Sequence, residues 1–270
     1  MTVAATPLTP AQIRLACRNG TWTAPSTAGF AEGFVQANLI VLPSAYADDF
    51  RNLCLRNPVP CPLLGETKKG DWRVPEHLAK DADIRTDAPL YRVYKGGKFI
   101  QERANLLEEW NEDSVGFFIG CSYSFESALT HAGLMPRQIE LQRNVPMYKT
   151  SVPLCAAGTL SGRMVVSMRP YPAELVDQAR SVTRPFVRAH GEPVAWGFEG
   201  MKALGIDDPT GQNPDFGGIS EVREGEVPVY WACGVTPQSA VMDSKLPEVI
   251  LGHAPGHMMV LDMRDEEVCV

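Results

Sequence analysis

The chain has 270 residues, of which 44% are hydrophobic and 21% are charged, the balance of a soluble globular protein with a sizeable core. Its 25 Lys and Arg against 32 Asp and Glu give a net charge of −7, which argues against nucleic acid as a partner because that surface needs clustered cations. The apolar runs are too short for a bilayer, and no basic region precedes an apolar run at the N-terminus, so we expect neither a membrane partner nor a secretory signal.

Cysteine usage predicts a cytoplasmic location. The seven cysteines are odd in number, and none forms a C-x-x-C pair, so neither a zinc ribbon nor a redox motif is indicated. We expect most of them to be free thiols in a reducing compartment, where cysteine packs as a small hydrophobic residue.

The first ninety residues are predicted to form helices joined by proline-rich loops. Thr9 is a typical N-cap, and with Pro10 and Gln12 it predicts a helix that ends near Asn19-Gly20. Residues 29–39 are expected to form a second, amphipathic helix. A third is predicted from Ser44, as its cap, through residue 55. Residues 91–102, with a glycine turn in the middle, predict a β-hairpin.

From about residue 114 the pattern changes to alternating strands and helices. Strands are predicted at 115–120, 147–153, 163–168, 194–198, 227–233, 249–252 and 258–262, and helices at 124–131 and 172–187. Residues 207–218, rich in Gly, Pro and Asp, are expected to form a long loop. This order predicts an α/β fold with a mixed, mostly parallel sheet flanked by helices and a smaller inserted α+β subdomain. The main domain would comprise 1–144 plus 191–270, and the inserted subdomain 145–190.

An internal similarity is the most informative feature of the sequence. Residues 118–129 align without gaps on residues 230–241, and each copy contains an apolar strand, a cysteine, a hydroxyl residue and then Ser-Ala within a helix. The matched pairs are Cys121 with Cys233, Ser124 with Thr236, and Glu126 with Gln238. Shared capping preferences are the alternative explanation.

Two helices that begin at one edge of a parallel sheet would present unpaired N–H groups suited to a molecule with two carboxylates. An arginine could clamp a carboxylate through two parallel hydrogen bonds. The predicted substrate-binding residues are Cys121, Ser122, Ser124, Arg143, Asn144, Arg169, Cys233, Thr236 and Gln238. Two alternatives stay open, namely that Ser124 and Thr236 only cap their helices and that the cysteines only pack.

His253 and His257 flank a Pro-Gly turn between two predicted strands. The turn excludes the helical arrangement of two zinc ligands, but it could direct both imidazoles into a cleft for proton transfer, with Asp262 as their outer partner. Simple packing or capping is the alternative. We predict no metal, because no third ligand is fixed by spacing, and no nucleotide cofactor, because no phosphate-binding loop is present.

Five motifs, in the expected order, resemble the D-glutamate cyclase family. They lie at residues 118–126, 143–148, 166–170, 231–238 and 252–258, and the similarity extends from Arg14 to about Asp262. Short bacterial members of that family are labelled hydro-lyases. The resemblance implies a two-part α/β fold and a hydro-lyase that acts on a small amino acid or carboxylate, with closure of D-glutamate to 5-oxo-D-proline plus water as the specific reaction.

In that reaction we expect His253 and His257 to act as base and acid, and the helix starts with Arg143 or Arg169 to hold the carboxylates. Two alternatives remain: a metal-dependent lyase or hydrolase using His253 and His257 with Asp262 or Asp215, and a non-catalytic carboxylate-binding protein. The partner is then a small carboxylate, and association into a homo-oligomer stays open.

Overall fold

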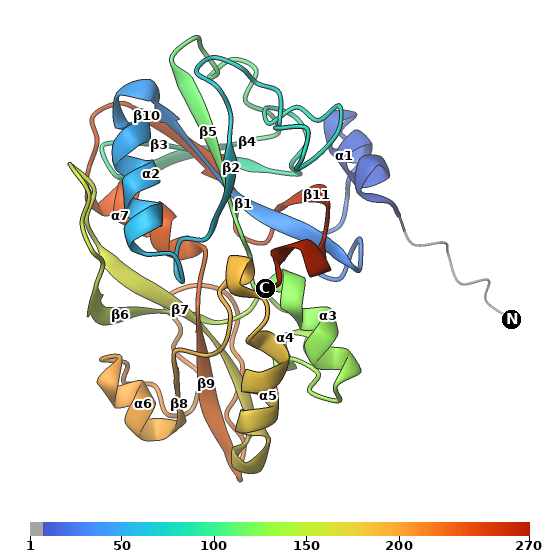
Figure 1. Ribbon diagram of the computed structural model, residues 1–270, viewed down its shortest axis with the longest axis vertical. Coiled ribbons are helices and arrows are strands. Elements are labelled where there is room, and N and C mark those ends of the chain that lie inside the picture. Colours follow the sequence, from blue (N-terminus) through green and yellow to red (C-terminus); the bar gives the residue numbers. More distant parts are fainter. Residues whose placement is uncertain (1–7) are drawn as a thin grey trace, which may run out of the picture.

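Two antiparallel β-sheets, one above the other in Figure 1, form the framework of this computed structural model, which describes residues 8–270. The first sheet has the order β2 (Leu63–Glu66), β5 (Ser114–Ile119), β1 (Phe34–Pro43), β10 (Val249–His253), β3 (Tyr91–Lys95) and β4 (Lys98–Arg103), and β11 (Met259–Arg264) also pairs with β1. The second has the order β6 (Met147–Pro153), β7 (Arg163–Pro172), β9 (Glu226–Ala232) and β8 (Ala195–Trp196).

The predicted mostly parallel sheet is therefore wrong, because every strand pair described is antiparallel. A strand followed by a helix is typical of the strand-helix-strand unit that joins two parallel strands. Here the next strand of the chain runs in the opposite direction or belongs to the other sheet. The division into a main domain and an insertion at 145–190 stays a prediction. The second sheet includes β8 and β9, which lie beyond residue 190.

Local signals predicted several elements correctly. Helix α1 (Pro10–Arg18) begins with the predicted capping box, in which Thr9 and Gln12 bond each other's backbone N–H groups, and it ends at Asn19. Strands β3 and β4 form the predicted hairpin, with both turn glycines at positive φ. Helix α2 (Ala47–Arg56) follows a 3-10 turn at Ser44–Tyr46, although Ser44 donates to Asp113 and does not cap the helix.

The predicted helix at 29–39 is wrong, because residues from Phe34 onward form the central strand β1. Strand β1 pairs with β5, β10 and β11, and its residues 35–42 are all buried. The segment alternates apolar residues with Gln36 and Asn38 and then has an apolar run at 39–43. Phe30, Phe34 and Ala37 also recur at helical spacing, so periodicity alone does not separate a helix from a strand here.

The internal similarity is confirmed as repeated structure, and it extends beyond the predicted segments. Strand β5 leads to helix α3 (Tyr123–His131) just as β9 leads to α7 (Val235–Asp243). Strands β1 and β7 each end in a proline, followed by a 3-10 turn and then α2 or α5 (Val176–Thr183). Pro43 pairs with the first residue of β5, and Pro172 pairs with the first residue of β9. Each sheet thus contains one copy of the same four-element unit.

The remaining elements complete the covering of the sheets. The predicted strand at 194–198 is reduced to β8 and followed by α6 (Gly197–Ala203), and the predicted helix at 172–187 shortens to α5. Helix α4 (Arg137–Glu140) and 3-10 turns at Ala173–Leu175, Val187–Ala189 and Asp265–Val268 make up the rest, while 207–218 is the expected loop. None of the helices described for residues 8–270 has the length and apolar character needed to cross a bilayer.

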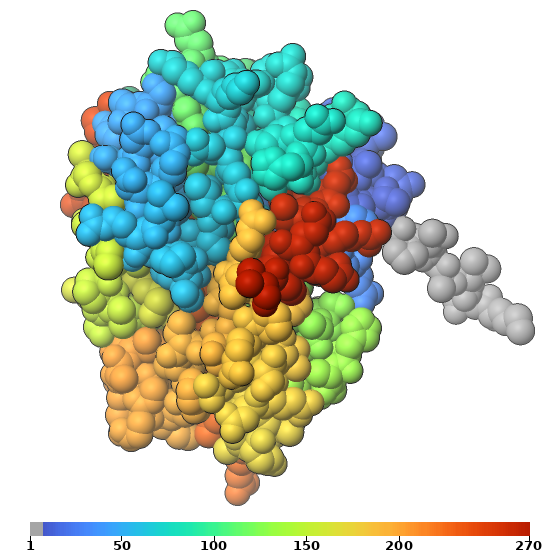
Figure 2. Space-filling view, viewed as in Figure 1, coloured from blue at the N-terminus to red at the C-terminus, as the bar shows by residue number. Residues whose placement is uncertain are grey.

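One hydrophobic cluster joins the two sheets. It includes Phe117 and Ile250 from the first sheet, Val166 and Tyr230 from the second, and Phe50 from α2. The C-terminal residues, red in Figure 2, lie on the surface beside the segments around residues 80 and 185, and the last backbone N–H donates to Pro185 O at 2.9 Å. The two copies are therefore held as one packed body.

Candidate active site

The turns that follow β5 and β9 lie against each other, although they belong to different sheets. Asn38 of β1 donates to the carbonyl oxygen of Gly120 at 3.1 Å, and its side chain fills the space beside Gly234 so closely that a Cβ there would overlap it. Tyr123 and Val235, the first residues of α3 and α7, pack against one small cluster that contains Cys233. The internal repeat thus brings two helix starts together at one place in the molecule.

His253 belongs to this junction through Asn38. Its Nε2 lies 3.2 Å from Asn38 Oδ1 and its Nδ1 lies 2.8 Å from Ala254 O, so both neighbouring atoms are acceptors. Burial lowers the pKa of His253 to about 4, which leaves the ring neutral at pH 7 with one N–H for these two acceptors. With the proton on Nε2, His253 holds Asn38 and the turn, and with the proton on Nδ1 it bonds the carbonyl of Ala254.

Arg169 is the buried charge of the junction. Its guanidinium, fully buried in β7, forms an ion pair with Glu126 of α3 and bonds to Ser122 at 3.0 Å and to Ser167 at 3.1 Å. The same group lies over the ring of Trp231. These contacts link the two copies of the repeat, and the pair with Glu126 neutralises the guanidinium.

The other predicted hydroxyl and thiol residues are also enclosed. Thr236 Oγ1 is bonded to both the N–H and the carbonyl of Val165, at 2.9 and 3.0 Å, so it anchors α7 to β7. Ser124 lies inside α3 and does not cap it, and its buried hydroxyl faces the carboxyl group of Asp265. Burial raises the pKa of the Cys121 thiol to about 12 and that of Cys233 to about 11, which disfavours a thiolate nucleophile.

An open cavity of about 300 Å³, which we call the α7 pocket, lies beside the junction. Its lining residues are Arg92, Tyr94, Gly97, Met147, Lys149, Phe216, Val235, Gln238, Ser239, Met242, Asp243 and Pro255. Gln238 donates to the Tyr94 hydroxyl at 2.9 Å, and burial raises the pKa of Tyr94, which keeps its proton at neutral pH. The volume is at the lower end of the range for small-molecule sites.

Two cations, Arg92 and Lys149, and one carboxylate, Asp243, line the α7 pocket. Arg92 forms an ion pair with Glu102 at 3.0 Å. Lys149 forms no ion pair among residues 8–270, and its ammonium lies 5.5 Å from the ring centre of Phe216. Of the predicted residues, only Gln238 lines this cavity. Arg92, Lys149 and Tyr94 are not among the predicted binding residues, because they come from strands β3 and β6, far apart in the sequence, although Lys149 directly follows the motif at 143–148. The other available signal was the long loop that carries Phe216.

Three further predicted residues lie outside the lining of the α7 pocket. Asn144 accepts from the Tyr123 hydroxyl at 2.8 Å and lies near Gly256, so it joins α3 to the histidine loop. Arg143 is exposed and packs beside Gly218. His257 is half-buried, and its Nδ1 lies 3.0 Å from Pro255 O. If that nitrogen donates its proton to Pro255, Nε2 keeps a free lone pair.

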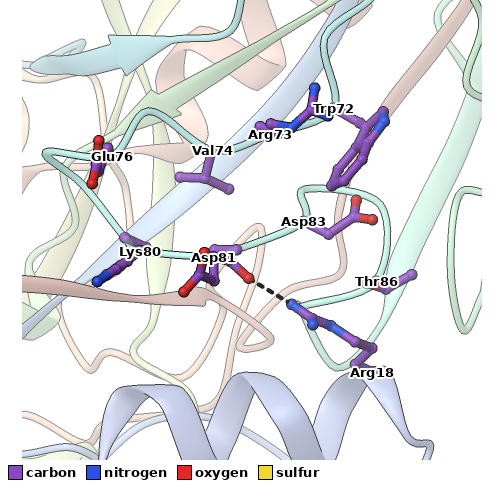
Figure 3. A pocket seen from close by; sticks show the side chains of 11 residues that line it. Arg18, Trp72, Arg73, Val74, Glu76, Lys80, Asp81, Asp83 and Thr86 are labelled. Atoms are coloured by element: carbon purple, nitrogen blue, oxygen red, sulfur yellow. Dashed lines mark hydrogen bonds between the residues drawn. The ribbon is translucent and has the colours of Figure 1, made fainter.

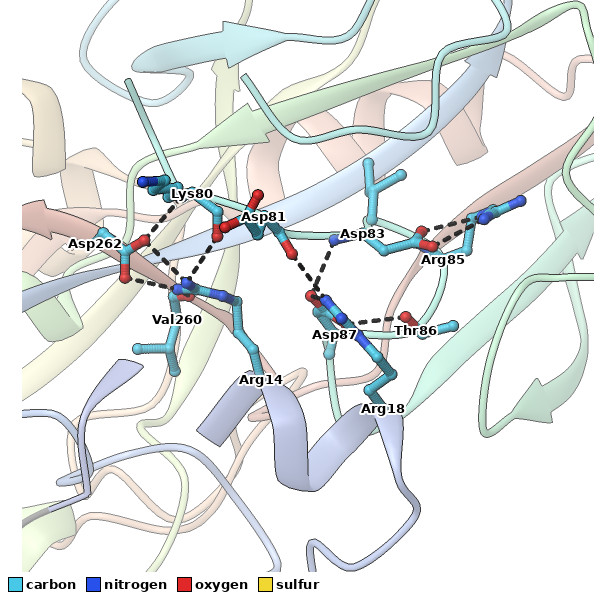
Figure 4. Close-up of polar contacts among 12 residues, drawn as sticks. Arg14, Arg18, Lys80, Asp81, Asp83, Arg85, Thr86, Asp87, Val260 and Asp262 are labelled. Atoms are coloured by element: carbon cyan, nitrogen blue, oxygen red, sulfur yellow. Dashed lines mark hydrogen bonds and ion pairs between the residues drawn. The ribbon is translucent and has the colours of Figure 1, made fainter. Parts of the chain in front are cut away.

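Asp262 is held by α1 and not by the histidines. Its two carboxylate oxygens accept from Arg14 at 2.9 and 3.0 Å, and one also accepts from Lys80 N, as Figure 4 shows. Arg14, only 3% exposed, also donates to Val260 O. These contacts do not make Asp262 the outer partner of His253 and His257, as the sequence predicts. Its carboxylate fastens α1 to the first sheet.

We therefore predict that Asp262→Asn lowers stability and leaves catalysis intact. Losing the charge on this half-exposed carboxylate should cost about 1 kcal/mol in the free energy of unfolding, because Arg14 stays buried and loses its counter-ion. Urea unfolding measures the cost, with the exposed Asp177→Asn as a control expected to change stability by less than about 0.5 kcal/mol. A stable Asp262→Asn protein that has lost its activity would return Asp262 to the active site.

The residues proposed for a metal do not form a ligand set. Among residues 8–270 no three His, Cys, Asp or Glu side chains are grouped to hold a metal ion. Both ring nitrogens of His253 face protein acceptors, Asp262 is engaged by Arg14, and Asp215 accepts from Lys149 N at 2.8 Å.

A second cavity, of about 550 Å³, lies beside α1 and is drawn in Figure 3. It contains none of the predicted residues. Arg18 pairs with the buried Asp87 at 2.6 Å and Arg73 lies over the ring of Trp72, whereas Glu76, Lys80 and Asp81 form no ion pair among residues 8–270. Unlike the α7 pocket, this cavity is lined by no residue of the two repeats. We therefore place the candidate active site at the α7 pocket.

Comparisons with known proteins agree with the motifs. A family model described as D-glutamate cyclase matches residues 115–262. A protein of Schizosaccharomyces pombe named "Putative hydro-lyase" is 51% identical over 257 residues, which cover 94% of this chain and 84% of that protein. One of the same name in Geobacillus kaustophilus is 47% identical over the full length of both. Among solved structures, a nitrogen repressor-like protein of Methanococcus jannaschii covers 94% of this chain and 98% of its own, with a TM-score of 0.37 and 8% identity, too low to carry an argument.

Proposed function

This chain belongs to the D-glutamate cyclase family, and on that premise we propose that it is a hydro-lyase acting on a small carboxylate held in the α7 pocket. We place the substrate there because Arg92 and Lys149 line a cavity of small-molecule size beside the junction of the two repeats. The unpaired ammonium of Lys149 supports the binding of an anion.

We propose D-glutamate as the substrate and 5-oxo-D-proline with water as the products. Arg92 and Lys149 would each take one carboxylate, and the Gln238 amide would add a hydrogen bond. Holding both ends of the molecule bends it, so that its amine approaches the γ-carboxyl carbon. The cations also stabilise the charge on the carboxyl oxygens of the tetrahedral intermediate.

Two nearby groups suit the proton transfers. The substrate ammonium gives up two protons, the C–N bond forms, the C–O bond breaks, and one carboxyl oxygen leaves with two protons as water. We propose His257 as the base. It does not line the pocket, but it lies two residues beyond Pro255, which does, and its Nε2 lone pair is free when Nδ1 donates to Pro255 O. We assign the acid to Tyr94, which burial keeps protonated and which lines the pocket.

Lys149→Met is the direct test of the site. We expect it to weaken D-glutamate binding at least about tenfold, a loss of about 1.4 kcal/mol, because the side chain keeps its length and loses its charge. Isothermal titration measures the affinity, and chromatographic detection of 5-oxoproline measures turnover. Lys202→Met, at an exposed lysine of α6 that pairs only with Glu199, is the matched control and should bind as the wild type does.

Two results would contradict the proposal. Equal affinity of Lys149→Met and wild type for D-glutamate would remove the site from the α7 pocket. Binding without 5-oxoproline above the uncatalysed rate would leave a carboxylate-binding protein and reject the reaction.

A further inference from the structure

Another cavity is lined by α3 in the way that the α7 pocket is lined by α7. This cavity of about 250 Å³, which we call the α3 pocket, is lined from α3 by Tyr123, Glu126, Ser127 and Thr130. The residues at the same four positions of the repeat, in order, are Val235, Gln238, Ser239 and Met242, and all four line the α7 pocket. The two cavities are therefore equivalent parts of a duplicated unit.

The charged residues that line the two pockets differ. Among the described residues that line the α3 pocket there is no lysine or arginine, whereas Glu32, Glu126 and Asp265 all contribute carboxyl groups. The amide of Gln238 in one repeat is replaced by the carboxylate of Glu126 in the other. We therefore expect the α3 pocket to favour a cation over an anion.

A buried acceptor with no hydrogen-bond partner among residues 8–270 lies in its wall. Gln36 is 4% exposed and donates its amide N–H groups to Thr27 O and Phe30 O, which leaves its Oε1 without a donor. Asp265 faces the buried Ser124 hydroxyl, whose hydrogen bond lowers its pKa, but burial is the larger effect and raises the pKa of Asp265 to about 7. Buried acceptors are rarely left unpaired, because each costs about 1–3 kcal/mol.

Glu126 adds a further acceptor. Its Oε1 takes the contacts from Arg169 and Gln138, while Oε2 has no hydrogen bond among residues 8–270. The outer part of the pocket is apolar, with the exposed side chains of Phe30, Met135 and Ile139.

We infer that the α3 pocket is a second ligand site, which binds a small primary ammonium ion carrying a short apolar group. An ammonium supplies three N–H donors and one positive charge, which match the unpartnered acceptors and the carboxyl groups of the wall. The apolar group would lie along Phe30 and Met135. This site is separate from the proposed reaction and does not depend on it.

The repeat provides a matched pair of blocking variants for the test. Thr130→Trp fills the α3 pocket, and Met242→Trp fills the α7 pocket at the equivalent position. Asp265→Asn keeps the shape of the α3 pocket and removes one carboxyl group. The probes are butylammonium, tetramethylammonium as a cation without N–H donors, and butyrate as an anion of similar size, each titrated calorimetrically at pH 8.

We expect butylammonium to bind the wild type and Met242→Trp equally, at least about tenfold more weakly to Thr130→Trp, and more weakly to Asp265→Asn. Tetramethylammonium and butyrate should not compete for the α3 pocket. The inference is overturned if butylammonium does not bind the wild type, if Thr130→Trp binds it unchanged, or if only Met242→Trp loses it. Turnover of D-glutamate by Thr130→Trp and its loss in Met242→Trp report separately on the proposed function.

Discussion

Arg169→Ala is expected to lower the free energy of unfolding by about 3–5 kcal/mol, because it removes one partner of a fully buried ion pair. Glu126 would keep its charge in the interior with only the amide of Gln138 to bond it. The guanidinium also supports Ser122 in the turn before α3, so the junction of the two repeats should loosen together with the loss of stability.

Urea unfolding of Arg169→Ala gives the cost, and Arg163→Ala is the matched control on the same strand. Arg163 is exposed and should change stability by less than about 0.5 kcal/mol. Adding Glu126→Gln to Arg169→Ala should recover part of the loss, because it removes the unpaired charge while keeping the shape of the side chain. A cost below about 1 kcal/mol for Arg169→Ala would show that this pair does not hold the two repeats together.

The sequence predicted those elements whose cause is local. The capping box of α1 lies within Thr9–Gln12, and the hairpin of β3 and β4 depends on two glycines that reach positive φ. The repeat at 118–129 and 230–241 was visible because its residues are matched in order. Each of these signals is contained in a short segment, so no knowledge of the partner strands is needed.

Strand partners and site composition could not be predicted in this way. Strand β1 was taken for a helix because its burial comes from three partner strands that lie elsewhere in the chain. Asp262 was assigned to the histidines nearby in sequence, but its partner Arg14 is 248 positions away. Lys149 faces the α7 pocket because β6 and the loop with Phe216 meet there, which depends on the whole fold.

Acid is expected to destabilise the protein through His190 and His253, two buried histidines beside the turn that follows β5. Burial lowers the pKa of each to about 4, whereas in the unfolded chain it is about 6.5. The unfolded state therefore binds more protons below pH 6.5, so the stability due to these groups is complete above that pH and is lost as the pH falls towards 4. Each contributes about 3 kcal/mol, of which about 2 should be lost by pH 5.

Asp265 acts in the opposite direction, because its pKa is raised in the folded state and its protonation favours folding as the pH falls. The effect of the two histidines on the pH dependence of stability should therefore be measured in proteins that carry Asp265→Asn. There, His190→Asn with His253→Gln should reduce the stability lost between pH 7 and pH 5 by about 4 kcal/mol, measured by urea unfolding at both pH values.

Asparagine is chosen at position 190 because His190 has a φ of 83°, a conformation that asparagine tolerates. His131→Gln, an exposed histidine of α3, is the control and should leave the pH dependence unchanged. An equal loss of stability in the background and in the double variant would mean that the two imidazoles are already protonated in the folded state at pH 5. A neutral ring at the junction would then be the wrong description of His253.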